Sequence, residues 1–465
     1  MRHPLRVLLV STYELGRQPF GLAEPAAVLS AEVGAEVRTL DLAVQDFDEA
    51  AFSRAELIAV YLPMHTATRL AARLVPRVRA LNSRAHLAAY GLYAPLNAPY
   101  LRRLGITTIL GGEFEAGLTR LAKRVESRIA SGAGASDAGV QTEAEISLDR
   151  QAFRVPDRSG LPPLERYAHL HLPNQASRTV GYVEASRGCK HLCRHCPVVP
   201  IYRGKFRVVP HQVVLEDIRQ QVAAGAAHIT FGDPDFLNGP GHAIPLVESL
   251  HVEFPDLSYD VTIKIEHLLR NRQHLSTLRD TGCLFVTSAV ESADDAVLEI
   301  LAKDHTRADF VRAAALMNDV GLILQPTFVT FTPWTSLQGY LELLELIAEL
   351  DLIEHVAPIQ YAIRLLIPAG SMLLELPAVR ELVDEFDEEA LAHPWSHPDP
   401  RMDRLHAEVL EAVKPSRTSG MPRGESFQKV RTLALQAREG EAIVLPPDLA
   451  PRRSPVPYLT EPWYC

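Results

Sequence analysis

The chain has 465 residues, more than one hydrophobic core usually serves, so we expect two or three domains. Hydrophobic residues make up 47% and charged residues 22%, the balance of a globular protein rather than a disordered or membrane-spanning one. The formal net charge of −10 repels a phosphate backbone, which argues against nucleic acid as a partner. Every apolar run is too short for a signal sequence or a membrane span, so we expect a cytoplasmic protein that does not contact membranes.

Residues 1–127 alternate short apolar runs with amphipathic segments. We expect strands near residues 7–10, 36–40, 57–62, 86–90 and 107–110, and helices at 25–34 and 66–81. This alternation predicts a doubly wound, Rossmann-like domain with a parallel sheet and helices on both faces. Residues 128–174 begin rich in Ser, Ala and Gly without apolar periodicity, which predicts a linker and a lead-in to the next domain.

Residues 175–370 repeat the alternation of strands and helices. We expect strands near residues 180–185, 228–231, 259–265, 284–290, 322–330 and 355–366, and helices at 211–224, 294–301, 307–320 and 336–350. Six such units predict a partial (βα)6 barrel of the TIM type, whose chemistry lies at the C-terminal ends of its strands. Residues 371–465 are helical in pattern and then rich in proline, which predicts a mostly helical C-terminal region.

Three of the five cysteines crowd into one short segment, GCKHLCRHC, just after the first strand of the second series. In a cytoplasmic protein this cluster at Cys189, Cys193 and Cys196 indicates metal binding rather than disulfides. A four-iron cluster used for electron transfer normally takes four thiolates, whereas this loop offers three and leaves one iron open. The alternative is a structural zinc site with His191 or His195 as the fourth ligand.

The spacing C-x₃-C-x₂-C resembles the signature of the radical S-adenosylmethionine (radical SAM) superfamily, and the similarity extends over about residues 179–366. The resemblance implies an enzyme that cleaves S-adenosylmethionine (SAM) reductively at a 4Fe–4S cluster and releases a 5′-deoxyadenosyl radical. It also implies an electron donor such as flavodoxin or ferredoxin. A non-catalytic iron–sulfur or zinc protein is the alternative. The isolated Cys283, at the start of an apolar strand, is expected to be a buried structural thiol.

Further segments resemble the SAM-binding motifs of this superfamily. The segment FGDP at 231–234 is similar to a Gly-Gly-Glu-Pro turn that holds the amino group of SAM, and SAVES at 288–292 is similar to the end of the fourth strand. By this resemblance, the SAM contacts come from His195 beside the adenine, Gly232, Asp233, Lys264, Glu266, Glu291 and Ser292. Each of these residues taken singly is equally consistent with a solvated polar group at a strand end.

The doubly wound domain resembles the cobalamin-binding domain of one branch of the superfamily. The segment GRQPFGLAEPAAVLS is similar to the entry into its first helix, and Gly111 and Gly112 resemble its final turn. Glycines there let the backbone approach a cofactor closely. The sequence lacks an Asp-x-His-x-x-Gly motif, so the resemblance implies cobalamin binding without a histidine ligand. A domain that kept this fold and lost the cofactor is the alternative.

The expected substrate is a small molecule or a peptide, with methyl transfer as the outcome if cobalamin binds. Arg364 is the predicted substrate contact, because its guanidinium pairs with anionic groups. A tRNA-modifying radical SAM enzyme is the alternative, although the C-terminal part does not resemble the small basic barrel of that class.

The last residues, TEPWYC, resemble the tail of a small radical SAM subgroup. Members of that subgroup end in Cys-Cys-Ala-Glu-Pro, or in the same motif with selenocysteine in the second place. The resemblance implies that the chain continues past Cys465 through a selenocysteine, which would make it a selenoprotein. The alternative is a chain end whose cysteine has no role.

Overall fold

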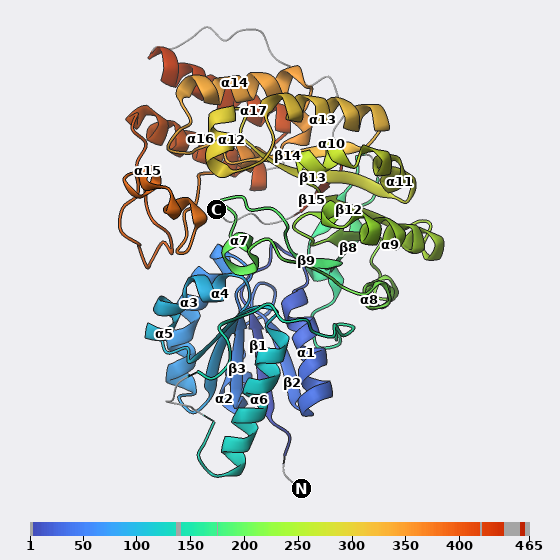
Figure 1. The fold of residues 1–465 in the computed structure, drawn as a ribbon, viewed down its shortest axis with the longest axis vertical. Coiled ribbons are helices and arrows are strands. Elements are labelled where there is room, and N and C mark those ends of the chain that lie inside the picture. Colours follow the sequence, from blue (N-terminus) through green and yellow to red (C-terminus); the bar gives the residue numbers. More distant parts are fainter. Residues whose placement is uncertain (1–2, 136–140, 174, 419–420, 441–455, 461–465) are drawn as a thin grey trace.

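The computed structural model describes residues 3–135, 141–173, 175–418, 421–440 and 456–460. A doubly wound α/β domain, blue to teal in Figure 1, lies below a curled half-barrel that carries the helical C-terminal region. Cys465, and with it the proposed selenocysteine tail, lies outside the described residues. Within the described ranges, none of the helices combines the length and the apolar character that a membrane span requires.

The first sheet has six parallel strands in the order β2-β1-β3-β4-β5-β6. They are β1 (Arg6–Ser11), β2 (Glu36–Asp41), β3 (Leu57–Tyr61), β4 (His86–Tyr90), β5 (Thr108–Gly112) and β6 (Ile146–Ser147). The first five were predicted, whereas β6 lies in residues expected to be a linker. The Gln141 side chain both donates to and accepts from the Ile109 backbone, which extends the edge of β5 toward β6.

Helices cover both faces of this sheet. They are α1 (Phe20–Val33), α2 (Glu49–Arg54), α3 (His65–Leu81), α4 (Tyr93–Leu96), α5 (Ala98–Arg103) and α6 (Glu115–Ala130). Alternate residues of each strand point to opposite faces, so Leu8 and Leu9 of β1 belong to two separate hydrophobic clusters. The helix α1 begins before the expected residue 25. Pro25 leaves the Gly21 carbonyl without its helical donor, and the Tyr90 hydroxyl donates to that carbonyl instead.

The second sheet follows the order β14-β13-β12-β11-β8-β7-β15, and its first five strands are parallel. They are β7 (His169–His171), β8 (Arg178–Val183), β11 (His228–Phe231), β12 (Ser258–Thr262), β13 (Cys283–Glu291), β14 (Ile323–Phe328) and β15 (Tyr458–Leu459). The strand expected at residues 355–366 is reduced to a single parallel bridge between Arg364 and Phe331, because the earlier residues form the 3₁₀ turns η4 (Ile353–His355) and η5 (Pro358–Ala362). The Gln360 side chain, rather than a strand backbone, accepts from the Phe328 amide.

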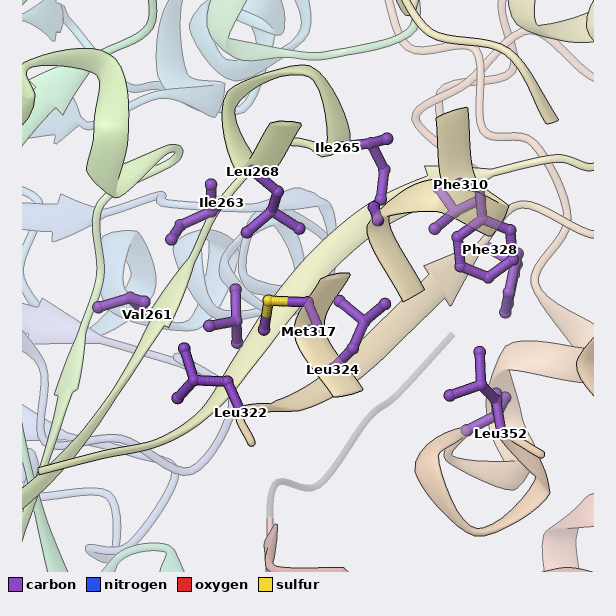
Figure 2. Packing of buried hydrophobic residues seen from close by; sticks show 14 of the residues in the cluster. Val261, Ile263, Ile265, Leu268, Phe310, Met317, Leu322, Leu324, Phe328 and Leu352 are labelled. Atoms are coloured by element: carbon purple, nitrogen blue, oxygen red, sulfur yellow. The ribbon is translucent and has the colours of Figure 1, made fainter. Parts of the chain in front are cut away.

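Helices pack outside the half-barrel and continue into the C-terminal region. They are α8 (His211–Ala223), α9 (Pro240–Glu253), α10 (Ile265–Arg270), α11 (Leu275–Asp280), α12 (Asp295–Leu301), α13 (Arg307–Val320), α14 (Leu337–Glu349), α15 (Pro377–Arg380), α16 (Pro400–Thr418) and α17 (Arg423–Glu439). Figure 2 shows Phe310 of α13 beside Phe328 of β14, and Met317 of α13 beside Leu324 of β14, in one hydrophobic cluster. Cys283 is buried in the same cluster, as predicted for a structural thiol.

The cysteine segment lies between two short antiparallel strands, β9 (Ser186–Gly188) and β10 (Phe206–Val208). It contains the helix α7 (Val198–Tyr202), which Figure 1 places between the two domains. Ile201 and Tyr202 of this helix pack into a hydrophobic cluster of the first domain. The first domain therefore supports the cysteine loop directly.

Arg187 of β9 joins the two domains through a buried ion-pair network. Its guanidinium lies 2.9 Å from a Glu24 oxygen and 2.5 Å from a Glu115 oxygen, both of the first domain. It also lies 3.0 Å from Glu184 and 3.7 Å from Glu113. Burial raises the pKa of Glu113 to about 7 despite the nearby guanidinium. One cation thus balances several buried carboxyl groups beside the cysteine loop.

We expect Arg187→Met to lower the free energy of unfolding by about 3–5 kcal/mol, because it leaves buried carboxylates without a counter-charge. Urea unfolding followed by circular dichroism measures the loss. Arg154→Met is the control, since Arg154 pairs with Glu32 at the surface and should cost less than about 1 kcal/mol. Equal losses in the two variants would contradict the proposed role of the network.

Candidate functional site

The cysteine loop starts at the carboxyl end of β8 and is anchored by side chains from the next strand turn. Asp233, which follows β11, accepts hydrogen bonds from the Ser186 hydroxyl and the Ala185 amide. Asn238 accepts from the Lys190 amide at 3.2 Å, and its own amide donates to the Cys189 sulfur at 3.5 Å. These contacts fix the backbone on which the first cysteine sits.

The far end of the loop is tied to the C-terminus of α12. The Arg194 amide donates to the Leu301 carbonyl at 2.9 Å, and its guanidinium donates to the Glu299 and Ile300 carbonyls. Carbonyls at a helix C-terminus lack helical donors, so a cation is favourable there. The segment carrying Cys193 and Cys196 is therefore held independently of any bound metal.

The spacing of the thiols discriminates between the two predicted metal sites. The Sγ atoms of Cys189, Cys193 and Cys196 do not all lie within 4.8 Å of one another. A single zinc ion bound at about 2.3 Å by each thiolate would draw the sulfurs to roughly 4 Å apart. A cubane cluster binds each thiolate at a different corner and needs a wider arrangement. The loop therefore fits a 4Fe–4S cluster better than zinc.

Buried charge next to the thiols also suits an iron–sulfur cluster. Burial raises the pKa of the Cys196 thiol to about 12, so bound metal must supply the positive charge that deprotonates it. Lys303 is buried nearby, and Glu291, with a smaller contribution from the two cysteines, holds its pKa above the usual range despite its burial. An ammonium in this position stabilises negative charge on the cluster.

Glu291 ends β13 at a bulge with left-handed backbone, at φ +67°. One of its oxygens accepts from His195 Nε2 and from Lys303 Nζ, each at 3.2 Å. Burial opposes ionisation, but Lys303 and His195 outweigh it and lower the pKa of Glu291 to about 2. The next residue, Ser292, is buried and accepts from the Asp294 amide. The structure thus brings together two of the predicted SAM contacts, His195 and Glu291.

Lys264 follows β12 and carries a buried ammonium group. Its Nζ lies 4.0 Å from both Glu266 and Asp304 and has no hydrogen-bond partner among the described residues. An unsatisfied buried cation is costly unless a ligand supplies the missing acceptor. An anionic ligand would supply that acceptor to Lys264, whereas Glu266, at the start of α10, is half-buried and faces Lys264 and His191.

Asp233 in the FGDP turn was expected to contact SAM, but its side chain binds the cysteine loop instead. Both oxygens of Asp233 accept from the start of the cysteine loop, and burial raises its pKa to about 7. Gly232 is required for packing, since a Cβ atom there would lie 1.9 Å from the Tyr182 hydroxyl. The Asp233 side chain thus holds the loop, and only the backbone of the turn is available to a ligand.

A cavity of about 210 Å³ lies between the domains. Its lining includes Tyr61, Leu92 and Gly112 from the first domain and Glu184 and Gly232 from the half-barrel. The predicted Gly112 therefore reaches this cavity, although a Cβ atom there would meet the Ser147 carbonyl at 2.2 Å. A Cβ atom on the predicted Gly111 would meet Pro95. Both glycines are thus explained by packing within the protein.

Arg364, the predicted substrate contact, is engaged by its own neighbours. Its guanidinium donates to Asp403 and to the Trp395 carbonyl, and it lies 3.6 Å from the centre of the Trp395 ring. Sequence reasoning missed these partners, which are more than 30 residues away. It also missed Lys303 and Asn238, because the polar turns that carry them look like any surface turn.

Residues 183–353 match the family model described as the radical SAM superfamily. Among curated proteins, a tRNA-2-methylthio-N(6)-dimethylallyladenosine synthase of Desulfosudis oleivorans is 24% identical over 232 residues, which are 48% of this chain and 49% of that protein. The ribosomal protein uS12 methylthiotransferase RimO of the same organism is 27% identical over 146 residues, 30% of this chain and 32% of that protein. The chain spans about half the length, or less, of these relatives.

Two solved structures share the architecture. The cobalamin-dependent SAM radical enzyme OxsB, with aqua-cobalamin and SAM bound, aligns with a TM-score of 0.65 at 14% identity, over 94% of this chain and 71% of that chain. The radical SAM methyltransferase TsrM from Kitasatospora setae, with tryptophan and a SAM analogue bound, aligns with a TM-score of 0.63 at 16% identity. The alignment covers 94% of this chain and 95% of that chain. These likenesses confirm the predicted fold class, and the family match confirms the resemblance to radical SAM proteins.

We expect Glu291→Gln to lower the free energy of unfolding by about 3 kcal/mol at pH 7, because it leaves Lys303 buried and unpaired. The pKa of Glu291 falls from 4.5 to about 2 in the folded chain, so its stabilisation is present above pH 4.5 and is lost as the pH falls toward 2. Urea unfolding at pH 7 and at pH 4 measures the gap between wild type and variant. If the difference in unfolding free energy between wild type and variant does not shrink at pH 4, the ion pair between Glu291 and Lys303 does not stabilise the fold.

Proposed function

We propose that this chain, a radical SAM enzyme, cleaves SAM reductively at a 4Fe–4S cluster held by Cys189, Cys193 and Cys196. The cluster and SAM are the cofactors of this family, and together they supply a 5′-deoxyadenosyl radical. The observation that carries the proposal is the anchored loop of three separated thiols at the carboxyl end of a barrel strand. Three protein ligands leave one iron for the amine and carboxylate of SAM.

The side chains around the loop have distinct roles in this proposal. Lys264 binds the carboxylate of SAM with its unpaired ammonium, and the backbone at Gly232 receives the amino group. His195 is oriented by Glu291 so that its ring lies beside the adenine. Lys303 keeps Glu291 ionised and balances the charge of the thiolates. Burial of these groups keeps water away from the reactive radical.

Cys193→Ala removes one of three ligands, so we expect loss of the cluster and of all 5′-deoxyadenosine formation. The protein is purified without oxygen, iron and sulfide are quantified, and dithionite and SAM are added before chromatography. Cys283→Ala is the matched control, since this thiol is buried in the core and should leave iron content unchanged. Cleavage of SAM by Cys193→Ala, or a wild type that holds zinc instead of iron, would refute the proposal.

For the substrate we propose a small molecule or a peptide, with flavodoxin or ferredoxin as the electron donor. The net charge of −10 supports this class over a polyanion. A tRNA or a ribosomal protein is the second candidate, because the curated relatives carry such substrates in their names. Their similarity covers at most half of either chain, so it supports shared chemistry more strongly than a shared substrate. Arg364 can bind an anionic group of the substrate only if its guanidinium first releases Asp403.

We further propose that cobalamin binds between the domains and takes part in methyl transfer. The support is the architecture shared with cobalamin-dependent enzymes and an interdomain cavity lined by Phe20, Tyr61, Met64 and Leu92. Apolar and aromatic walls of this kind suit the edge of a corrin ring. The cavity volume of about 210 Å³ is smaller than usual cofactor sites, so side chains at its wall must move on binding.

We expect the full chain to retain about one cobalamin after incubation with hydroxocobalamin and gel filtration. Leu92→Trp fills the cavity and should abolish retention while SAM cleavage continues. The absorbance spectrum of the protein fraction measures retention. Leu70→Trp is the control, because Leu70 is exposed on the outer face of α3 and lies outside the cavity lining. Failure of the wild type to retain cobalamin removes this proposal and leaves the SAM cleavage proposal standing.

A further inference from the structure

Two histidines and an aspartate meet beside the cysteine loop at a point that the proposed chemistry does not use. His191 belongs to the loop, Asp235 caps the turn η2 (Phe236–Asn238) after β11, and His267 lies in the first turn of α10 after β12. His267 Nδ1 lies 2.7 Å and His191 Nε2 3.2 Å from Asp235 Oδ2. All three ligand atoms lie within 4.8 Å of one another.

These three atoms are buried and lack hydrogen-bond partners within the described residues. The side chain of Asp235 is fully buried, and those of His191 and His267 are 10% and 8% exposed. Their contacts are at ion-pair distance but without hydrogen-bond geometry. Both imidazoles face the same oxygen of Asp235, and one shared metal ion would satisfy all three atoms at once.

The groups behind these atoms orient them as a metal site requires. Asp235 Oδ1 accepts from the Leu237 amide, which leaves Oδ2 free to bind an ion. The second ring nitrogen of His191, Nδ1, lies 3.7 Å from a Glu266 oxygen. Metal-bound histidines commonly direct their other ring nitrogen toward a carboxylate in this way. Two ligand atoms of a tetrahedral metal at about 2.1 Å lie about 3.4 Å apart, so His191 Nε2 at 3.2 Å from Asp235 Oδ2 is nearly in place and His267 Nδ1 at 2.7 Å would move slightly outward.

We propose that His191, Asp235 and His267 bind one divalent transition metal ion, separate from the iron–sulfur cluster. Two imidazoles and one carboxylate favour Fe²⁺ or Zn²⁺ over Mg²⁺ or Ca²⁺, which prefer oxygen ligands. Three protein ligands leave positions open for water or for an anionic group of the substrate. This inference goes beyond the proposed function, because it depends on the fold and not on SAM cleavage.

The test loads the anaerobically reconstituted full chain with Zn²⁺, removes free ions, and measures metals by mass spectrometry. We expect about one zinc per wild-type chain in addition to the cluster iron. Asp235→Asn and His267→Gln should each lose this zinc while iron and sulfide stay at wild-type levels. Glu266→Gln should keep the zinc with a Kd raised about tenfold, as measured by competition with a chromophoric chelator.

Asp260→Asn is the matched control. Asp260 is also a buried aspartate beside a histidine, but it accepts hydrogen bonds from both His228 and Thr230. The variant should bind zinc like the wild type. X-ray absorption at the zinc edge separates the possible sites: nitrogen and oxygen neighbours at about 2.0–2.1 Å place zinc at the triad, and sulfur at about 2.3 Å places it in the cysteine loop.

Sulfur neighbours would overturn this inference and count against the cluster as well. A wild type that takes up no zinc, or variants that bind it as the wild type does, would overturn this inference and leave the cluster proposal untouched. If Asp235→Asn does not fold, His267→Gln and the wild-type spectrum still decide.

Discussion

The separation of the three cysteine thiols is the constraint from which the chemistry of this molecule follows. Asn238 and Asp233 hold one side of the loop, and the end of α12 holds the other. Sulfurs held this way suit the corners of a cluster and not a single tetrahedral ion. The buried Lys303, and Lys264, whose ammonium has no hydrogen-bond partner among the described residues, then provide positive charge where thiolates and a carboxylate ligand would bring negative charge.

The first domain takes part in this arrangement although it supplies none of the proposed cluster ligands. Arg187 anchors β9 to carboxyl groups of α1 and α6, and α7 inserts Ile201 and Tyr202 into the first domain's core. A change in either domain therefore reaches the cysteine loop through buried contacts. The interdomain cavity lies along the same surface, so a ligand bound there would touch residues adjacent to the loop.

Much of the architecture could be predicted from the sequence, because it depends on local periodicity. The five central strands of each domain and helices such as Arg307–Val320 follow from apolar spacing, and the cysteine loop follows from its C-x₃-C-x₂-C pattern. The extra strand β6 and the lost sixth barrel strand could not be predicted. The strand β6 pairs with β5 through backbone hydrogen bonds that a segment without apolar periodicity does not reveal, and Gln360 occupies the Phe328 amide with its side chain.

The site was predictable to the same extent and for the same reason. The cysteine motif and the expected strand ends identified most of the polar residues that gather around the cysteine loop, including Lys264 and Glu291. What each side chain does depends on partners that only the fold brings near. Asp233 holds the loop and Arg364 pairs with Asp403, while the triad centred on Asp235 joins three segments that are distant in sequence.

The most direct test of the open iron is the electron paramagnetic resonance spectrum of the reduced protein before and after SAM is added. We expect a single 4Fe–4S signal whose g-values shift on addition, because SAM becomes a ligand of the iron that the three thiolates leave free. A signal that SAM does not change, or reduced protein that has no cluster signal, would contradict the central claim.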